Sequence, residues 1–342
     1  MNKIEIVDRM LAALGAGEQA ELVVVTGSHG SAPRSAGAWM AVFANGSFCG
    51  TVGGGRVEDL ALAEASELLA AGKSRTVRYT LGGKKSDTGM ICGGAVDLCY
   101  ALVDDSVRAA LEQERDVLES RGEGVLAIDL APLGDDVDDT AAHGAESART
   151  AAGPLAWAVE HPLNQMDLRA GVSGGRYLEP ICPEGFTYVF GCGHVGRACA
   201  GALAAAGFAV VACDDRPEML EADLLPAAAD RRLVDYDDLA ATCAIGPRDL
   251  VVSATSGHGS DYAVVSQALA AHPSYLGCLG SRKKTAFVRG KLADDGFAPE
   301  DIEGIHMPIG VPIHAETPEE IAVSIVAELV SHRRTVLLPR PH

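Results

Sequence analysis

The first half of the chain mixes one helical repeat pattern with short apolar runs. Apolar residues at helical spacing over 4–14 predict an opening helix that Gly15-Ala16-Gly17 ends. Asn45-Gly46, between two apolar runs, predicts a hairpin turn. The segment 57–69 sets leucine and alanine against glutamate in the pattern of an amphipathic helix. The apolar runs that predict strands lie at 22–25, 39–43 and 77–81. We therefore expect a mixed α+β domain here.

The second half repeats apolar runs separated by helical stretches. The runs that predict strands lie at 186–190, 209–213, 249–253 and 275–279. Alternating β and α units favour a parallel sheet with helices on its faces, so the expected class is α/β of the Rossmann type. Thr317-Pro318-Glu319-Glu320 combines an N-cap, a proline at the first helical position and a glutamate at the third, which predicts a final helix.

Between these halves, residues 131–182 lose their periodicity and gather Gly, Pro, Asp and Ser. The sequence therefore predicts an N-terminal domain over 1–130, a linker and connecting segment over 131–182, and a Rossmann-like domain with its terminal helix over 183–342. The acidic run at 134–139 is typical of a solvated loop, with cation binding as the alternative.

Composition narrows the classes of function. The 342 residues carry a formal charge of −19, which disfavours nucleic acid and anionic membrane surfaces as partners. The nine cysteines are scattered without a C-x-x-C pair, which argues against a zinc site or a disulfide framework. The N-terminus lacks a signal-peptide pattern, and the longest uncharged apolar region, 198–213, is too short to span a bilayer. We expect a cytoplasmic protein with reduced thiols.

The run Gly191-Cys192-Gly193-His194-Val195-Gly196 follows an apolar strand and precedes an alanine-rich helix. In that context, glycines at 191, 193 and 196 are typical of a turn that lets the backbone approach a pyrophosphate at a helix N-terminus. Asp214 follows Gly191 by 23 residues, near the usual spacing of an acidic ribose partner. The predicted ligand class is an adenine nucleotide or dinucleotide such as NAD(P). A Rossmann turn that has lost its ligand is the alternative.

Two glycine-rich loops lie close together in the first half. Gly30-Ser31-Ala32-Pro33-Arg34 follows a strand, and Gly53-Gly54-Gly55-Arg56 precedes a helix. Small residues let loop amides converge on oxygen atoms, and Arg34 or Arg56 is able to fork onto a phosphate or a pterin carbonyl. The alternative is a pair of tight turns whose arginines bind neighbouring carboxylates.

Cys92 lies in Gly89-Met90-Ile91-Cys92-Gly93-Gly94, between glycines that leave its thiol unshielded. Such a thiolate is suited to contact a soft metal or to carry sulfur; a structural thiol is the alternative. Cys99, Cys199 and Cys213 are predicted to be core residues.

Two histidines are predicted at the carboxyl edge of the parallel sheet, where ligands of open α/β folds bind. His194 lies inside the glycine turn and His258 follows a strand, so each is a candidate ligand contact or proton carrier. His258 is alternatively a helix cap. Ser281 and Arg282 belong to a loop, 277–284, that gathers three positive charges after a strand and is the best second anion contact.

Taken together, these segments resemble the xanthine dehydrogenase accessory factor family, XdhC/CoxI. The matching segments are GSAPR at 30–34, GTVGGG at 50–55, CGG at 92–94, FGCGHVGRA at 190–198, CDDRPE at 213–218, LGSRKK at 279–284, PIG at 308–310 and TPEEIAVSIVAEL at 317–329. The resemblance implies a cytosolic, commonly dimeric maturation factor. It would bind molybdenum cofactor (molybdopterin), protect it during sulfuration with a cysteine desulfurase as partner, and hand it to a molybdenum hydroxylase apoenzyme.

The resemblance also implies site residues. Gly30, Ser31, Arg34 and Cys92 would face the cofactor, while the 191–196 turn would hold a phosphate. Many family members carry cysteine where this chain has Arg56, which weakens any two-thiol mechanism with Cys92. A non-catalytic chaperone is the leading hypothesis. An NAD(P)-dependent oxidoreductase and a ligand-free scaffold that recruits a partner enzyme are the alternatives.

Overall fold

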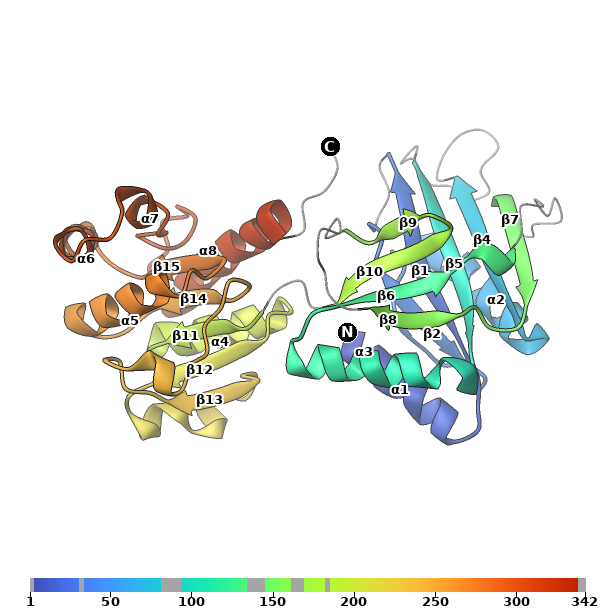
Figure 1. The fold of residues 1–342 in the computed structure, drawn as a ribbon, viewed down its shortest axis with the longest axis horizontal. Coiled ribbons are helices and arrows are strands. Elements are labelled where there is room, and N and C mark those ends of the chain that lie inside the picture. Colours follow the sequence, from blue (N-terminus) through green and yellow to red (C-terminus); the bar gives the residue numbers. More distant parts are fainter. Residues whose placement is uncertain are drawn as a thin grey trace. The chain divides into compact units, whose positions relative to one another are not determined.

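A computed structural model describes residues 3–30, 34–80, 94–133, 145–160, 169–181 and 185–337. The chain forms two compact units, Met1–Cys182 and Pro183–His342, which are drawn together in Figure 1 and described separately below. None of the helices in these ranges is both long and apolar enough to cross a membrane.

A six-stranded antiparallel sheet forms the centre of the first unit. Its strands, in spatial order, are β3 (Phe48–Gly50), β2 (Trp39–Phe43), β1 (Ala20–His29), β5 (Ala95–Val103), β4 (Lys73–Thr80) and β7 (Ala145–Ala152). The predicted hairpin at Asn45-Gly46 is confirmed, because β2 and β3 pair antiparallel and Gly46 adopts a φ of 79°. A predominantly apolar run such as 20–25 is expected when a strand is buried on both faces, as β1 is.

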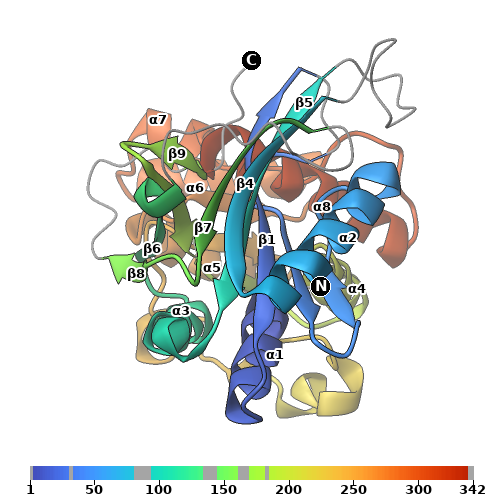
Figure 2. The same ribbon diagram turned by 90° about the vertical axis from the view of Figure 1, so that its right-hand side faces the viewer.

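The two faces of this sheet have separate cores. Val23 and Val25 face α2 (Gly55–Ala71), while Leu22 and Val24 face the core that contains α1 (Lys3–Gly15) and α3 (Arg108–Ser120). Figure 2 shows β1, β4 and β5 side by side at the centre of this unit. Alternate side chains of β1 thus pack into the two cores, and this requirement fixes the register of β1 with its neighbouring strands. The predicted helices over 4–14 and 57–69 are confirmed by α1 and α2.

A smaller antiparallel sheet completes the first unit, and it occupies much of the predicted connecting segment. Its strands, in spatial order, are β8 (Trp157–Glu160), β6 (Gly124–Asp129), β10 (Arg176–Ile181) and β9 (Gly171–Ser173). Together with β7, these strands give the described parts of 131–182 regular structure in place of the linker that we expected. The strands that lie within 131–182 are short and have a weak apolar pattern, so pairing with β4 and β6 supplies their order.

The second unit is a parallel sheet covered by helices on both faces, which confirms the predicted Rossmann-type α/β class. Its strands, in spatial order, are β13 (Asp230–Leu233), β12 (Val210–Asp214), β11 (Thr187–Phe190), β14 (Leu250–Ser253) and β15 (Tyr275–Cys278). The chain order reverses between β11 and β14, and ligands of open α/β sheets bind beside such a switch point.

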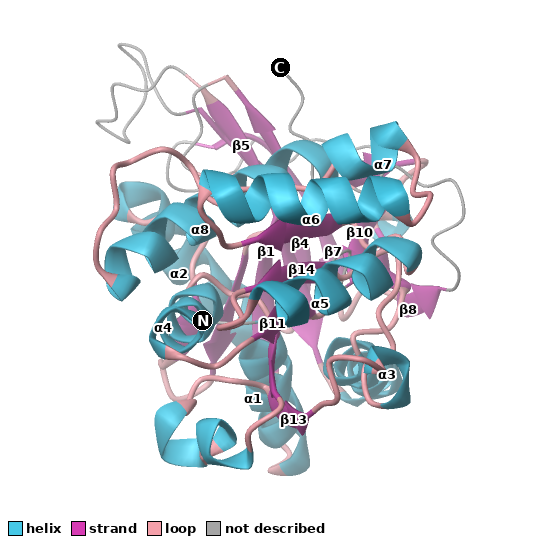
Figure 3. Ribbon diagram, turned by 90° about the vertical axis from the view of Figure 1, so that its left-hand side faces the viewer, coloured by secondary structure: helices cyan, strands magenta, loops and turns pink. Residues whose placement is uncertain are grey.

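The helices of this unit divide between the two faces. Figure 3 shows α5 (His258–Ala270) and α6 (Arg282–Asp294) across one face of the sheet. On the other face α4 (His194–Ala205) packs beside α8 (Pro318–His332). The short helices of this unit are η4 (Pro217–Leu220), η5 (Ala222–Leu224), η6 (Leu239–Ala241), α7 (Pro299–Glu303) and η7 (Arg333–Leu337), while η1 (Asp105–Val107) and η2 (Ala131–Leu133) belong to the first unit.

The last predicted helix begins where its capping signal places it. The Thr317 hydroxyl accepts the N–H of Glu320 at 3.2 Å, and the Glu320 carboxylate accepts the N–H of Thr317 at 3.1 Å. This reciprocal pair satisfies two amides that no helix partner reaches, so the box fixes the start of α8.

Candidate functional site

The glycine turn joins β11 to α4, and its three glycines have different structural roles. Gly191 has a φ of +93°, and a Cβ there would lie 2.6 Å from the carbonyl oxygen of Ala254. A Cβ on Gly196 would lie 1.8 Å from the carbonyl oxygen of Gly191. A Cβ on Gly193, which caps α4, would meet no atom within 4 Å. Packing therefore requires Gly191 and Gly196, while Gly193 leaves the helix N-terminus open to an approaching anion.

Asp214 lies at the end of β12, beside this turn, with a fully buried side chain. Its carboxylate accepts the N–H of Cys192 at 2.6 Å and that of Arg216 at 3.0 Å, and it pairs with the Arg216 guanidinium at 2.9 Å. Burial raises the pKa of Asp214, but the hydrogen bonds from Arg216 and Cys192 outweigh burial and hold that pKa below its usual value. The Asp214 carboxylate thus stabilises the glycine turn through the N–H of Cys192. A ribose contact by Asp214 stays a prediction.

The predicted basic loop after β15 is only partly available to a ligand. Ser281 caps α6 by accepting the N–H of Lys284 at 3.4 Å, and Arg282 is exposed. Lys284, in contrast, turns inward and pairs with the buried carboxylate of Asp261. Only two of the three positive charges therefore face outward. His258 is the first residue of α5, and its side chain lies outside the described part of the structure.

Asp261 organises the loop that follows β14. Its carboxylate accepts the Ser253 hydroxyl at 2.8 Å and the N–H of Thr255 at 3.2 Å. The Cα of Thr255 would lie 2.7 Å from a Cβ on Gly191. The two loops at the switch point are thus packed together, and the buried Asp261–Lys284 pair holds the second one in place.

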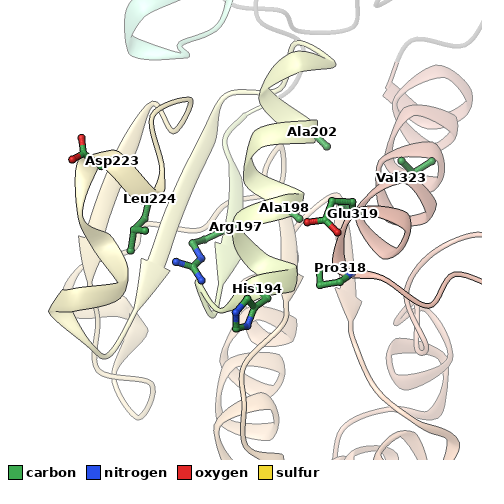
Figure 4. A pocket seen from close by; sticks show the side chains of 10 residues that line it. His194, Arg197, Ala198, Ala202, Asp223, Leu224, Pro318, Glu319 and Val323 are labelled. Atoms are coloured by element: carbon green, nitrogen blue, oxygen red, sulfur yellow. The ribbon is translucent and has the colours of Figure 1, made fainter.

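A cavity of about 580 Å³ lies along α4, beginning at the glycine turn. Figure 4 shows His194 and Arg197 near the start of the helix, with Asp223 and Leu224 on one side and Pro318 and Glu319 on the other. The wall contains the His194 imidazole and the Arg197 guanidinium, and it also contains the carboxylates of Asp223 and Glu319. The predicted position of His194 at the phosphate turn is consistent with this cavity.

In the first unit, three strand ends meet where the predicted cofactor loops begin. His29, the last residue of β1, pairs with Ala95, the first residue of β5, and Ala95 pairs with Thr80, the last residue of β4. Gly30 directly follows His29, and Gly94 directly precedes Ala95, so both predicted loops leave from this one end of the sheet. Arg34 is exposed, whereas Ser31 and Cys92 lie outside the described residues.

The GTVGGG loop lies toward the same end. The N–H of Thr51 donates to the carbonyl of Trp39 at 2.8 Å, at the start of β2, which runs antiparallel to β1. Gly53, Gly54 and Gly55 have φ values of 141°, 77° and 60°, and Gly54 donates its N–H to Glu58 at 3.2 Å. This backbone requires glycine, since side chains disfavour positive φ. Arg56 is exposed on the first turn of α2.

Sequence reasoning missed a charged cluster at the three strand ends. Asp97 of β5 accepts the Nε of Arg78 at 2.6 Å and its Nη2 at 2.8 Å, and His29 Nε2 lies 3.0 Å from the same carboxylate. Burial raises the pKa of Asp97, but hydrogen bonds from Arg78 and His29 lower it below its usual value. The available signal was a charged residue inside the apolar strand 95–103 and a histidine directly before a glycine loop.

These features define a protein that joins an antiparallel α+β unit, with glycine loops at one sheet end, to a Rossmann unit with an intact glycine turn. The chain belongs to the XdhC and CoxI family, so the resemblance drawn from the sequence is confirmed. The model of the XdhC Rossmann domain matches residues 187–329, and the model of the XdhC and CoxI family matches residues 13–80.

Individual relatives are similar over almost the whole chain. A Bacillus subtilis protein described as a probable subunit of xanthine dehydrogenase is 26% identical over 333 residues, which cover 93% of this chain and 94% of the relative. The molybdenum cofactor insertion chaperone PaoD of Escherichia coli is 27% identical, over 94% of this chain and 86% of the relative. The crystal structure of a xanthine dehydrogenase from Bacillus halodurans has the same fold, with a TM-score of 0.77, 24% identity and coverage of 98% and 97% of the two chains.

Proposed function

We propose that this protein is a molybdenum cofactor chaperone that protects the cofactor, supports its sulfuration and delivers it to a xanthine dehydrogenase-type hydroxylase. The observation that carries the proposal is the meeting of β1, β4 and β5 at one sheet end, from which the Gly30–Arg34 and Cys92–Gly94 segments depart. The chaperone name of the Escherichia coli relative supports the same cargo.

The donors at this sheet end suit a phosphorylated pterin. The exposed guanidiniums of Arg34 and Arg56 supply local positive charge. Such local charge is needed to bind an anion, because the chain as a whole carries a net charge of −19. Backbone amides that begin with Gly30 would bind cofactor oxygens. In the second loop the N–H groups of Gly53 and Gly54 already donate to Thr51 and Glu58, so Arg56 is the donor that this loop would offer. The Cys92 thiol would contact molybdenum or its sulfur ligand, as soft thiolates do.

Anaerobic co-purification with metal and pterin analysis tests the cargo directly. We expect the wild-type protein to retain molybdenum and pterin in equal amounts on gel filtration, and Cys92→Ala to retain less. Cys199→Ala is the matched control, because Cys199 is a buried core residue of α4 in the other unit. Wild-type protein with no affinity for freshly released cofactor would contradict the proposal.

The proposed partners follow from the same role. We expect a molybdenum hydroxylase apoenzyme to bind the cofactor-loaded form more tightly than the empty one, a cysteine desulfurase to bind as well, and the protein to be a homodimer. Pull-down with each partner and sedimentation equilibrium check these points. A partner that binds loaded and empty protein equally would favour a scaffold instead.

A second candidate function rests on the Rossmann unit. The open N-terminus of α4 at Gly193 and the adjacent His194 imidazole and Arg197 guanidinium favour a nucleotide phosphate. An NAD(P)-dependent oxidoreductase would bind NADH in calorimetric titration, and Arg197→Ala would weaken that binding. Tight NADH binding together with reduction of a small carbonyl substrate would favour this function over cofactor delivery.

A further inference from the structure

In the His29–Asp97–Arg78 cluster, the Asp97 carboxylate has one more partner than it needs for its charge to be paired. Arg78 alone already engages both oxygens of Asp97 with a two-pronged hydrogen bond. The Arg78–Asp97 pair therefore links the ends of β4 and β5 without any contribution from His29. His29 nevertheless lies 3.0 Å from Asp97 and keeps 57% of its side chain exposed.

Gly27 shows that space is made for this arrangement. It pairs across the sheet with Asp97, and a Cβ at Gly27 would lie 2.8 Å from the Asp97 carboxylate oxygen that His29 also contacts. A side chain at 27 would displace the carboxylate from under the imidazole. The glycine thus permits the hydrogen bond that orients the ring.

The orientation leaves one ring nitrogen for a ligand. Nε2 of His29 faces Asp97 of β5 and lies 3.3 Å from Nη2 of Arg78 of β4. Among the described residues, Asp97 and Arg78 are the charged residues that face the ring. In the same ranges no hydrogen bond reaches Nδ1. A carboxylate behind one ring nitrogen fixes the orientation of the ring, so that the other nitrogen points away from Asp97 and is available to a ligand.

We propose that His29 is a binding residue for the phosphate monoester of the cofactor: held by Asp97, it donates Nδ1–H to a phosphate oxygen beside the Gly30–Arg34 loop. This inference rests on the proposed function and names which part of the cargo the sheet end recognises. Asp97 is a positioning residue, and Arg78 keeps Asp97 ionised. In a chain of net charge −19, an anion must be held by local donors such as this one.

The test measures the affinity of purified full-length protein for freshly released molybdenum cofactor at one fixed pH. We expect His29→Gln to weaken binding about tenfold, the loss of one charge-assisted hydrogen bond. His29→Arg, which places a guanidinium donor at the same position, should bind within about threefold of wild type.

Two further arms separate the possible causes. Asp97→Asn should reproduce part of the loss, because an amide orients the ring but does not stabilise its charge. Cofactor treated with phosphatase should bind wild type and His29→Gln equally. A His29→Gln protein that binds intact cofactor as wild type does, or a His29→Arg protein that binds as weakly as His29→Gln, would overturn the inference and leave the chaperone function standing. Wild-type protein that binds no cofactor would overturn both.

Discussion

The carboxylate of Asp214 accepts the backbone N–H of Cys192 at 2.6 Å, which ties the end of β12 to the glycine turn after β11. Because Arg216 shares the same carboxylate, a buried charge is both paired and hydrogen-bonded. The turn therefore keeps its shape through Asp214, independently of any ligand.

Asp214→Asn should destabilise the Rossmann unit by about 2–4 kcal/mol at pH 7, because the amide presents a donor to groups that are themselves donors. The pKa of Asp214 is lowered in the folded protein, so its stabilising contribution is full above the unfolded-state pKa, about 3.9, and is lost as pH falls through the folded value. Urea denaturation should show the variant's deficit shrinking below about pH 4. A deficit that stays constant to pH 3 would contradict this.

Gly196→Ala should prevent the turn from closing, because its Cβ would lie 1.8 Å from the backbone oxygen of Gly191. We expect a loss of more than about 3 kcal/mol or failure to fold. Gly201→Ala on the same helix is the matched control: nothing lies within 4 Å of its Cβ, and alanine should stabilise the helix by about 0.5–1 kcal/mol. Chemical denaturation monitored by circular dichroism measures both, and equal effects would refute the steric argument.

Glu179 is the hub of the core of the first unit. It accepts the indole N–H of Trp39 at 2.8 Å and the Tyr177 hydroxyl at 2.6 Å, and it pairs with Lys3. Glu179→Gln should cost about 2–4 kcal/mol, since it leaves a partly buried ammonium without its counter-charge. Glu160→Gln, which breaks the exposed pair with Arg176, should cost less than about 1 kcal/mol. Urea midpoints of the two variants give the comparison, and similar shifts would argue against Glu179 as the hub.

Cys243 is expected to ionise near neutral pH. Its hydrogen bond with the Cys213 thiol, 3.8 Å away, lowers the pKa of Cys243 to about 7 despite burial, with help from Thr242 and Arg232. Ultraviolet thiolate absorbance should therefore show a titration step near pH 7 that Cys243→Ser removes. Cys213→Ala should move the step toward the ordinary thiol value of about 8.5. An unchanged step in Cys213→Ala would show that another group ionises there.

Local pattern was sufficient wherever one segment specifies its own structure. The capping box at Thr317, the hairpin glycine at 46 and the glycine turn at 191–196 all have the predicted structure, because short-range sterics and hydrogen bonds decide them. The strands between positions 145 and 181 were missed, because pairing with β4 and β6, more than their own weak pattern, gives them order.

The sequence by itself determined the Rossmann class of the second unit, the position of its glycine turn and the family to which the chain belongs. Only the tertiary structure decided how charged side chains are used. It turned Lys284 inward to Asp261, engaged Asp214 with the turn, and brought His29 to Asp97, 68 residues away. The physical reason is that periodicity and turn chemistry are short-range, whereas a charge finds its partner through strand register and packing, which no single segment encodes.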